Sequence, residues 1–224
     1  MLRFSIAIPT HDMKNKAVFL RRSLDAIKYQ QFKDFEVVIT DDSRDDALEK
    51  ICWEYNLKIN YSRNDSVLGM AGNSNQAIKK SQGELVKILY LDDYLLGNDA
   101  LWEINKKFRK DSYWLVTGCA HTVDGEELFN PYYASFNDKI YTGNNTIGSP
   151  SVLTIRNDES LPFDETLTWL LDCDLYMRYY KKYGRPVILD SLGVVIYQGD
   201  HQVTNILSDE IKIREQDYLL NKYQ

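Results

Sequence analysis

Residues 35–43 read FEVVITDDS, an apolar strand over 35–40 that runs directly into two acidic residues. A similar apolar run occupies residues 2–8, and neither alternates between apolar and polar positions, so both strands are expected to be covered on both faces. The apolar spacing between them predicts a helix over 14–30. The alternation continues with strands predicted over 57–61 and 85–91 and helices over 46–55 and 71–81. This order predicts an α/β fold with a parallel sheet of βαβ units.

The second half of the chain is less regular. Its patterns predict helices over 99–109, 172–183 and 206–223 and strands over 113–119 and 187–197. Residues 122–150 are punctuated by glycine, proline and asparagine, which is typical of turns and loops. Because no linker, repeat or low-complexity tract interrupts the chain, we expect one domain over residues 1–224, with a regular half (about 1–95) and an irregular half (about 96–224).

Length and charge restrict the class of protein. The chain has 224 residues, the length of one or two domains. It carries 27 basic and 33 acidic residues, a net charge of −6, which argues against general binding to nucleic acid or to an anionic membrane. Its apolar runs fall short of the ~18 residues of a membrane-spanning helix and of a signal peptide core, so a cytoplasmic location is expected. Three widely separated cysteines predict reduced, mostly buried thiols.

Polar side chains follow three of the predicted strands, at residues 9–12 (PTHD), 41–43 (DDS) and 92–93 (DD). The carboxyl ends of parallel strands form the ligand-binding edge of an open sheet, so two aspartate pairs are expected to meet there. Like charges held together cost free energy unless a ligand relieves them. A divalent cation that carries a diphosphate fits this requirement. The alternative for each single aspartate is a helix cap or a turn.

These motifs resemble those of the family 2 glycosyltransferases. The resemblance starts with residues 5–10 (SIAIPT) and 35–43, includes Asn64 and Gly69, and continues through 75–78 (NQAI), 83–86 (GELV), 91–93 (LDD), 163–165 (FDE) and 172–178 (DCDLYMR). It covers residues 4–95 and 148–200 and is weak between them. It implies a GT-A fold, in which a Rossmann-like, mostly parallel central sheet is flanked by helices, with a nucleotide-sugar-binding first half and an acceptor-binding second half.

The resemblance also implies roles for individual residues. Asp42 would accept the N3–H of a uracil or thymine, with Asp41 as its support, and Asp92 would meet the ribose. Asp93 would bind Mn²⁺ or Mg²⁺, and His201 would add a metal or phosphate contact unless it is an ordinary surface histidine. The residues expected near the nucleotide are Pro9, Thr10, Asp12, Asp41, Asp42, Asn75 and Asp92.

Asp172 would be the catalytic base that deprotonates the acceptor hydroxyl. The alternative is that Asp172 only complements the dipole of the helix that starts there. Asp174 points about 200° away on the same helix, so we expect it to pair with Arg178, four residues further on, rather than to share the site.

Several positions depart from the family pattern. Tyr90 stands two residues before Asp92, where members with the full acidic motif carry an acid, and this weakens the metal assignment. His11 replaces the usual tyrosine, and Ser74 replaces an arginine that often precedes the asparagine at 75. Leu171 stands where a glutamate usually precedes the catalytic aspartate.

The function expected from this reading is inverting, metal-assisted transfer of a sugar from a nucleoside diphosphate (UDP or dTDP) to the hydroxyl of a glycan or other acceptor. One candidate base and no evident nucleophile favour inversion. Tyr90 keeps open a non-catalytic nucleotide-sugar or glycan-binding module of the same fold. An Asp-rich metal-dependent phosphotransferase is disfavoured, because its nucleophilic aspartate with a second one two residues later is missing after the first strand. The oligomeric state is left open.

Overall fold

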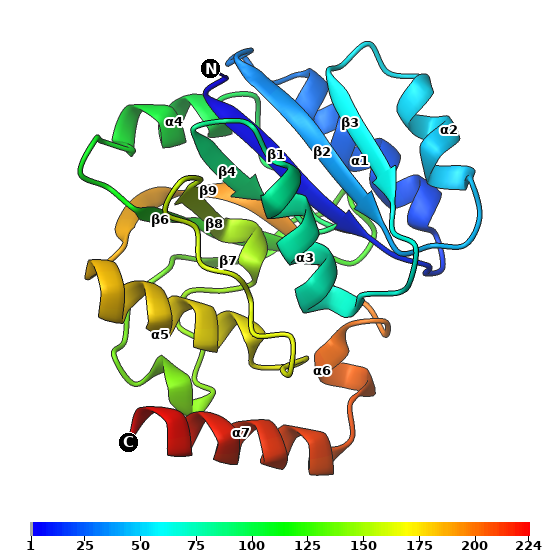
Figure 1. Ribbon diagram of the computed structural model, residues 1–224. Coiled ribbons are helices and arrows are strands. Elements are labelled where there is room, and N and C mark those ends of the chain that lie inside the picture. Colours follow the sequence, from blue (N-terminus) through cyan, green and yellow to red (C-terminus); the bar gives the residue numbers. More distant parts are fainter. Residues whose placement is uncertain (1) are drawn as a thin grey trace.

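The computed structural model describes residues 2–224, and its strands form one nine-stranded sheet (Figure 1). The strands are β1 (Phe4–Thr10), β2 (Phe35–Asp41), β3 (Ile59–Arg63), β4 (Leu85–Ile88), β5 (Tyr94–Leu95), β6 (Trp114–Thr122), β7 (Phe129–Tyr132), β8 (Leu153–Arg156) and β9 (Val187–Tyr197). They follow the order β3-β2-β1-β4-β8-β6-β9-β5, and β7 pairs with β6. β1 to β4 are mutually parallel, whereas β8 runs antiparallel to both of its neighbours.

Helices cover both faces of this sheet (Figure 1). They are α1 (Lys16–Lys28), α2 (Ala47–Trp53), α3 (Gly69–Lys80), α4 (Ala100–Lys107), α5 (Leu171–Tyr183), α6 (Val203–Ile206) and α7 (Asp209–Tyr223), with short 3₁₀ turns η1 (Ile140–Thr142) and η2 (Pro150–Val152). In the view of Figure 1, α1 lies behind the sheet and packs against α2, while α3 crosses in front of β1 and β2. Within residues 2–224, no helix is both long enough and apolar enough to cross a membrane.

The apolar composition of the first strands is explained by their position. Every residue of β1, β2 and β4 is buried, as expected for parallel strands covered on both faces. The chain leaves β1 in one direction toward β2 and β3 and returns through α3 to β4 on the other side of β1. This reversal opens a crevice at the carboxyl ends of β1 and β4, where open α/β sheets bind their ligands.

The element order agrees with the sequence-based expectation in the first half, where most boundaries differ from the predicted ones by one or two residues and that of β4 differs most. The strand predicted over 85–91 ends at Ile88. The chain turns there because the Asp93 amide bonds to the Tyr90 carbonyl (3.0 Å) and the Tyr90 amide to the Ser151 hydroxyl (2.8 Å). This turn presents Asp92 and Asp93 beyond the strand rather than within it.

From residue 94 onward the structure holds elements that the sequence patterns did not predict. Strands β5, β7 and β8 have two to four residues each, too short to show a period, and β7 and η1 lie in the region 122–150 that was predicted as turns and loops. The helix predicted over 206–223 is α7 alone, because Leu207 is extended and separates it from α6. The three cysteines are free and buried, as expected.

Candidate functional site

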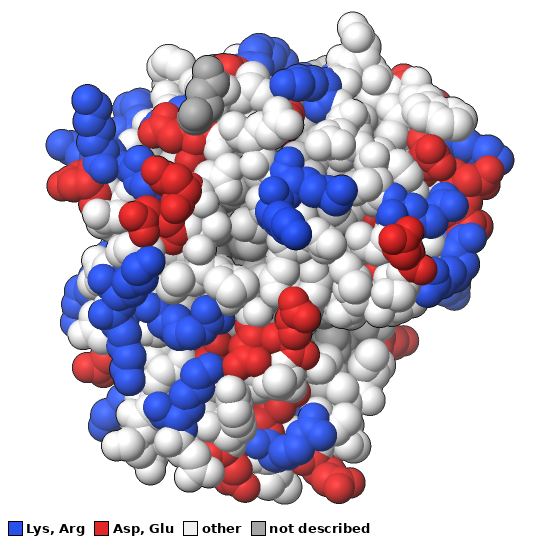
Figure 2. Space-filling model, viewed as in Figure 1, with Lys and Arg blue, Asp and Glu red and all other residues white. Residues whose placement is uncertain are grey.

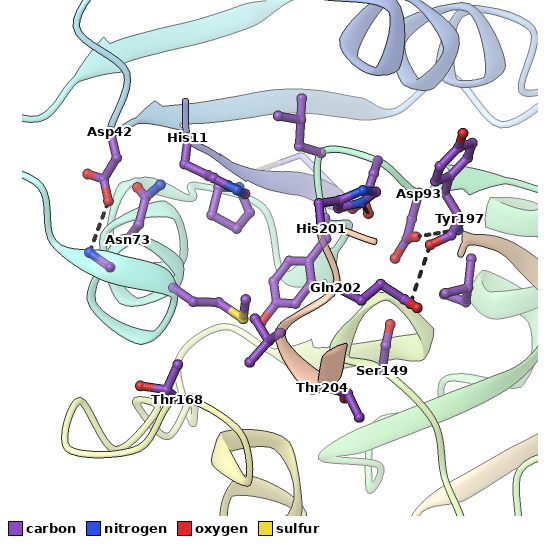
Figure 3. Close-up of a pocket in the computed structure, with 18 of the residues that line it drawn as sticks. His11, Asp42, Asn73, Asp93, Ser149, Thr168, Tyr197, His201, Gln202 and Thr204 are labelled. Carbon is purple, nitrogen blue, oxygen red and sulfur yellow. Dashed lines mark hydrogen bonds and ion pairs between the residues drawn. The ribbon is translucent and has the colours of Figure 1, made fainter. Parts of the chain in front are cut away.

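A cavity of about 410 Å³ opens at the carboxyl ends of β1, β2 and β4. Figure 3 shows Asp42 and Asn73 on one side of it, Asp93 and Ser149 on the other, and His11 and His201 between them. Residues from both halves of the chain contribute to the wall, including Pro9, His11, Asp42, Gly69, Asn73, Tyr90, Asp92, Asp93, Ser149, Thr168, Tyr197, His201 and Gln202. The cavity therefore has the position that the sequence predicted for the ligand-binding edge.

The structure brings five of the predicted site residues to this cavity and leaves five outside its wall. Those that line it are Pro9, Asp42, Asp92, Asp93 and His201. Those that do not are Thr10, Asp12, Asp41, Asn75 and Asp172. The contacts of each outlying residue explain its position.

Thr10 and Asp41 lie behind the wall. Asp41 is fully buried, and its carboxylate accepts hydrogen bonds from the Thr10 hydroxyl (3.0 Å), the Ser43 amide (2.8 Å) and the Tyr61 hydroxyl (2.7 Å). Burial and the neighbouring carboxylate raise the pKa of Tyr61 above its ordinary value, so it remains a donor. These bonds fix the end of β2 and hence the position of the next residue, Asp42.

Asp42 reaches the cavity, but its carboxylate is already partly satisfied. One oxygen accepts a bond from the Asn64 amide (2.8 Å), and the other accepts the backbone amides of Leu68 (3.1 Å) and Gly69 (3.0 Å) at the start of α3. A carboxylate has about four lone-pair sites. Asp42 thus caps α3 and keeps capacity for one further donor from the cavity.

Asn75 and Asp12 face other partners. The Asn75 side chain bonds to the Phe163 carbonyl (3.1 Å) and amide (2.7 Å) and to the Glu165 carboxylate (2.9 Å), so it ties α3 to the loop before α5. The exposed Asp12 pairs with Lys16 (2.8 Å). The asparagine that lines the cavity is Asn73, bonded to the Thr10 carbonyl (2.7 Å). Its signal in the sequence is its position one helical turn after Gly69, on the face of α3 that contacts β1.

Asp92, Asp93 and His201 form the acidic end of the cavity. The Asp92 carboxylate lies 2.9 Å from Nε2 of His201, and this hydrogen bond raises the pKa of the imidazole. Asp93 is 3% exposed and accepts the Tyr197 amide (3.1 Å). Burial and the adjacent Asp92 raise the pKa of Asp93 well above its ordinary value. The histidine predicted beside Asp93 as a metal ligand is therefore bonded to the neighbouring aspartate.

This donor set fits a divalent cation that a diphosphate also binds. Among residues 2–224, no cluster of three or more histidines, cysteines and acids could hold a metal ion alone. Mg²⁺-like ions, however, use one or two carboxylates and complete their shell with phosphate oxygens and water. A cation between Asp92 and Asp93 would also offset the repulsion between them, which adds to burial in raising the pKa of Asp93.

Tyr90 occupies the place of the acid that the family motif usually carries. It lines the cavity, and burial raises the pKa of its hydroxyl above the ordinary value. The residue is therefore neutral at physiological pH. The site has two carboxylates where the full motif would supply three.

Asp172 lies in the first turn of α5, close enough to Tyr90 for its charge to raise the pKa of that hydroxyl. Its carboxylate accepts the Asn145 amide (2.7 Å) and the Cys173 backbone amide (2.7 Å). Burial raises the pKa of Asp172 to about 6. A carboxylate with this pKa is ionised at neutral pH and still basic enough to accept a proton, which suits a general base.

The charges along α5 follow its dipole. Figure 2 shows acidic side chains gathered over the N-terminal end of α5 and the loop before it, and basic side chains over its C-terminal end. Asp174 is buried and pairs with Arg178 (2.7 Å), as the sequence predicted. Its carboxylate also contacts Lys222 (2.8 Å) and Tyr223 (2.7 Å) of α7, so it does not share the site with Asp172.

Comparison with known proteins identifies the family. Residues 5–177 match the model described as Glycosyl transferase family 2. The chain belongs to this family. As a family 2 glycosyltransferase it carries the mixed α/β fold of the GT-A enzymes, as the sequence predicted, and α7 lies beyond the matched residues.

Two curated relatives illustrate the range of this glycosyltransferase family. The chain is 30% identical over 106 residues to the GalNAc(5)-diNAcBac-PP-undecaprenol beta-1,3-glucosyltransferase of Campylobacter jejuni. The aligned residues cover 43% of this chain and 32% of that protein. It is 23% identical over 212 residues to the putative colanic acid biosynthesis glycosyl transferase WcaA of Escherichia coli, 90% of this chain and 75% of the relative. The chain thus spans about a third of the first of these proteins.

Solved structures share the fold of this glycosyltransferase. The structure of residues 1–349 of Staphylococcus aureus TarS in complex with UDP-GlcNAc superposes with a TM-score of 0.69 at 21% identity, covering 92% of this chain and 62% of that one. The Pyrobaculum calidifontis mannosyltransferase in complex with GDP-Man and Mn²⁺ gives a TM-score of 0.65 at 14% identity, covering 89% and 58%.

A buried lysine lies beneath the acidic end of the site in this glycosyltransferase. Lys87 of β4 is fully buried, and its ammonium group donates to the Ser151 carbonyl. Burial lowers the pKa of Lys87 to about 7, and the Asp93 charge opposes this shift in part. The hydroxyl of Ser151 holds the Tyr90 amide, so Lys87 supports the turn that presents Asp92 and Asp93.

Replacing Lys87 with methionine is expected to change how stability depends on pH. Between pH 7 and 10.5 the unfolded chain keeps a proton on Lys87 that the folded protein lacks, so this lysine makes unfolding harder as pH rises. The free energy of unfolding of the wild type minus that of Lys87→Met should therefore increase by about 1.4 kcal/mol per pH unit. Urea unfolding at pH 7.5, 8.5 and 9.5 measures this difference. A constant difference would show that Lys87 stays charged in the folded protein.

Proposed function

We propose that the chain transfers a sugar from a nucleoside diphosphate to an acceptor hydroxyl with inversion at the anomeric carbon. The observation that carries this proposal is a single cavity with Asp42 at one end and the Asp92–Asp93 pair at the other. The nucleobase would bind near Asp42 and the diphosphate near the pair. Residues 1–95 would form the donor half of one domain and residues 96–224 the acceptor half.

The remaining acceptor capacity of Asp42 supports a uridine or thymidine nucleotide. Uracil and thymine present an N3–H donor, which a carboxylate accepts, whereas cytosine presents a lone pair at N3 that a carboxylate repels. UDP-GlcNAc and UDP are the ligands named for structures of TarS, which shares this fold, and this agrees with a uridine donor. GDP-Man in the more distant mannosyltransferase shows that the fold does not impose the base.

Asp42→Asn is expected to remove the discrimination between UDP and CDP. The wild type should bind UDP at least ~10-fold more tightly than CDP, because the N3–H of uracil makes a charge-assisted bond to the carboxylate whereas the N3 lone pair of cytosine faces a negative charge. An asparagine offers both an oxygen and an amide, so the variant should bind the two nucleotides about equally. Calorimetric titration with each nucleotide measures the ratio, and Asp46→Asn, an exposed carboxylate, is the control. A variant that loses affinity for both nucleotides to the same extent would show that Asp42 acts only as the cap of α3.

Asp92 and Asp93 would hold a divalent cation, Mn²⁺ or Mg²⁺, against the diphosphate, and His201 would contribute through its hydrogen bond to Asp92. Such a cation neutralises the negative charge that develops on the leaving diphosphate. The buried Asp93 supplies a fixed carboxylate, and the Asp92–His201 hydrogen bond orients a second one. Mn²⁺ in the mannosyltransferase complex agrees with this proposal.

Asp172 would act as the base. The acceptor oxygen forms the new bond to the anomeric carbon as the bond from that carbon to the diphosphate oxygen breaks, and the acceptor proton passes to the Asp172 carboxylate. Asn145 donates to this carboxylate and would hold it toward the acceptor. Among the described residues, the carboxylates that line the cavity are Asp42, Asp92 and Asp93, which the proposal assigns to the nucleobase and the diphosphate. No lining carboxylate is then left for a nucleophile, which supports inversion.

A screen for diphosphate release tests the proposal. UDP- and dTDP-sugars and GDP-Man are each incubated with Mn²⁺ or Mg²⁺ and a panel of glycan acceptors, and release of UDP, dTDP or GDP is recorded. We expect release that depends on both cation and acceptor for a uridine or thymidine donor. Binding of these donors without release under every condition would favour the non-catalytic module that Tyr90 keeps open.

We also propose a cytoplasmic site of action, and the three free, buried cysteines agree with it.

A further inference from the structure

The last helix holds the segment that leads into α5. Glu215 of α7 is 1% exposed, and its carboxylate accepts three consecutive backbone amides, those of Thr168 (2.8 Å), Trp169 (2.8 Å) and Leu170 (2.9 Å). Leu170 is the N-cap residue of α5 and provides no side-chain cap of its own. Glu215 therefore caps α5 from a helix 45 residues further along the chain.

Polar contacts also fix the two ends of this segment to α7. Lys222 bridges Asp164 (3.0 Å), before the segment, and Asp174 (2.8 Å), after it. Tyr218 donates to Asp164 (2.8 Å). Glu215 and Leu219 are the buried residues of α7, so the apolar contribution to its docking is small. Residues 164–174 are thus held by α7 mainly through hydrogen bonds and ion pairs.

The held segment faces the site. Thr168 lines the cavity, and Asp172 follows Leu170 by two residues. Charge-assisted hydrogen bonds are about twice as strong as neutral ones and more directional. Three of them on consecutive amides leave the backbone little freedom, so the position of the Asp172 carboxylate depends on a side chain that touches neither the cavity nor Asp172.

We infer that Glu215 is a positioning residue for transfer: by fixing the backbone of residues 168–170 it sets the Asp172 carboxylate against the acceptor. This inference rests on the proposed role of Asp172. Because the residues matched to the family end at 177, Glu215 lies outside the part of the chain that defines the family. Through Glu215, α7 would help to position the acceptor side of the proposed site.

Four proteins test this inference: the wild type, Glu215→Gln, Leu219→Ala and Asp217→Asn. Glutamine keeps the volume, but its amide group opposes one of the three N–H donors. Leu219→Ala loosens the docking of α7 without touching the carboxylate, and Asp217→Asn removes an exposed charge from the same helix. Each is measured for amide hydrogen exchange over residues 164–172, for binding of UDP with Mn²⁺, for Tm, and for the kcat of the donor–acceptor pair found by the screen.

Glu215→Gln is expected to exchange the amides of residues 168–170 at least ~10-fold faster and to lower kcat by ~10-fold or more, while the Kd for UDP changes less than about twofold. Asp217→Asn should match the wild type. Leu219→Ala should lower Tm as much as Glu215→Gln and leave kcat within about threefold of the wild type. If Glu215→Gln does not fold, Glu215→Asp, which keeps the charge and retracts it by one methylene, takes its place.

Three results would overturn the inference: unchanged exchange in Glu215→Gln, unchanged kcat despite faster exchange, or an equal loss of kcat in Leu219→Ala. Asp172→Asn, measured alongside, separates this failure from that of the proposed function. An Asp172→Asn protein that transfers at the parent rate contradicts the proposed base. If Asp172→Asn is inactive and Glu215→Gln is fully active, the proposed base stands and only the role of Glu215 is contradicted.

Discussion

Asp172→Asn is expected to transfer sugar ~10²-fold or more slowly than the wild type, the scale of a lost general base. The amide is isosteric with the carboxylate, and its single oxygen can keep one of the Asn145 and Cys173 hydrogen bonds while its NH2 group opposes the other donor. The fold should therefore be preserved with at most the loss of one hydrogen bond, which thermal unfolding checks. Binding of UDP with Mn²⁺ should be unchanged, because Asp172 does not line the nucleotide cavity. Single-turnover transfer at saturating donor measures the effect.

The pH dependence of the wild type gives a second measure of the same group. The pKa of Asp172 is raised to about 6, and only the ionised carboxylate accepts a proton, so the transfer rate should rise with pH up to about 6 and then level off. The residual activity of Asp172→Asn should not show this decline in rate below pH 6. Asp138→Asn removes an exposed carboxylate between β7 and η1 and should keep both the rate and its decline at low pH. If Asp172→Asn transfers at the wild-type rate, Asp172 is not the base and only complements the dipole of α5.

Asp93→Asn is expected to abolish the effect of divalent cations on nucleotide binding. In the wild type, UDP should bind ~10²-fold more tightly with Mn²⁺ than with a chelator, whereas the variant should bind it with similar, low affinity in both conditions. The physical reason is that Asp93 is the fixed, buried carboxylate of the pair, and an amide carries no charge to attract the cation. Calorimetry with and without EDTA gives both affinities.

The control for this prediction is Asp65→Asn, which removes an exposed carboxylate outside the cavity and should behave as the wild type. Thermal unfolding without ligand shows whether Asp93→Asn alters the fold. The variant should be no less stable than the wild type at neutral pH, because burial already penalises the charged form of Asp93. If the variant retains the full cation dependence, Asp93 is not the residue that holds the cation.

The first half of the fold could be predicted because its strands are buried on both faces. The apolar runs at 4–8 and 35–40 are long and uninterrupted, and the helices between them show a clear period. The short strand β8 could not be predicted in this way. It joins the sheet through pairing with β4 and β6 rather than through its own pattern, and such pairing depends on residues far away in the sequence.

The same distinction holds for the site. Asp42, Asp92 and Asp93 could be predicted because a strand end places the next residues at the sheet edge. Asn75 was expected near the nucleotide. The direction of a side chain on a helix depends on its position around the helix axis, and here Asn73 lines the cavity. Glu215 gave no signal in the sequence, since a lone glutamate on an amphipathic helix is normally solvated and only tertiary packing brings it to the amides of residues 168–170.

Helix α3 connects the nucleotide end of the proposed site to the loop that leads into α5. Its first amides bond to Asp42, at the nucleotide end of the cavity, and Asn75, two turns later, bonds to Phe163 and Glu165 in the loop that leads to the acceptor side. A nucleotide that shifted α3 against Asp42 would shift that loop as well. Thermodynamic linkage is reciprocal: a donor that raises acceptor affinity by a given factor has its own affinity raised by the same factor. One helix can thus make the two substrates cooperative without direct contact between them.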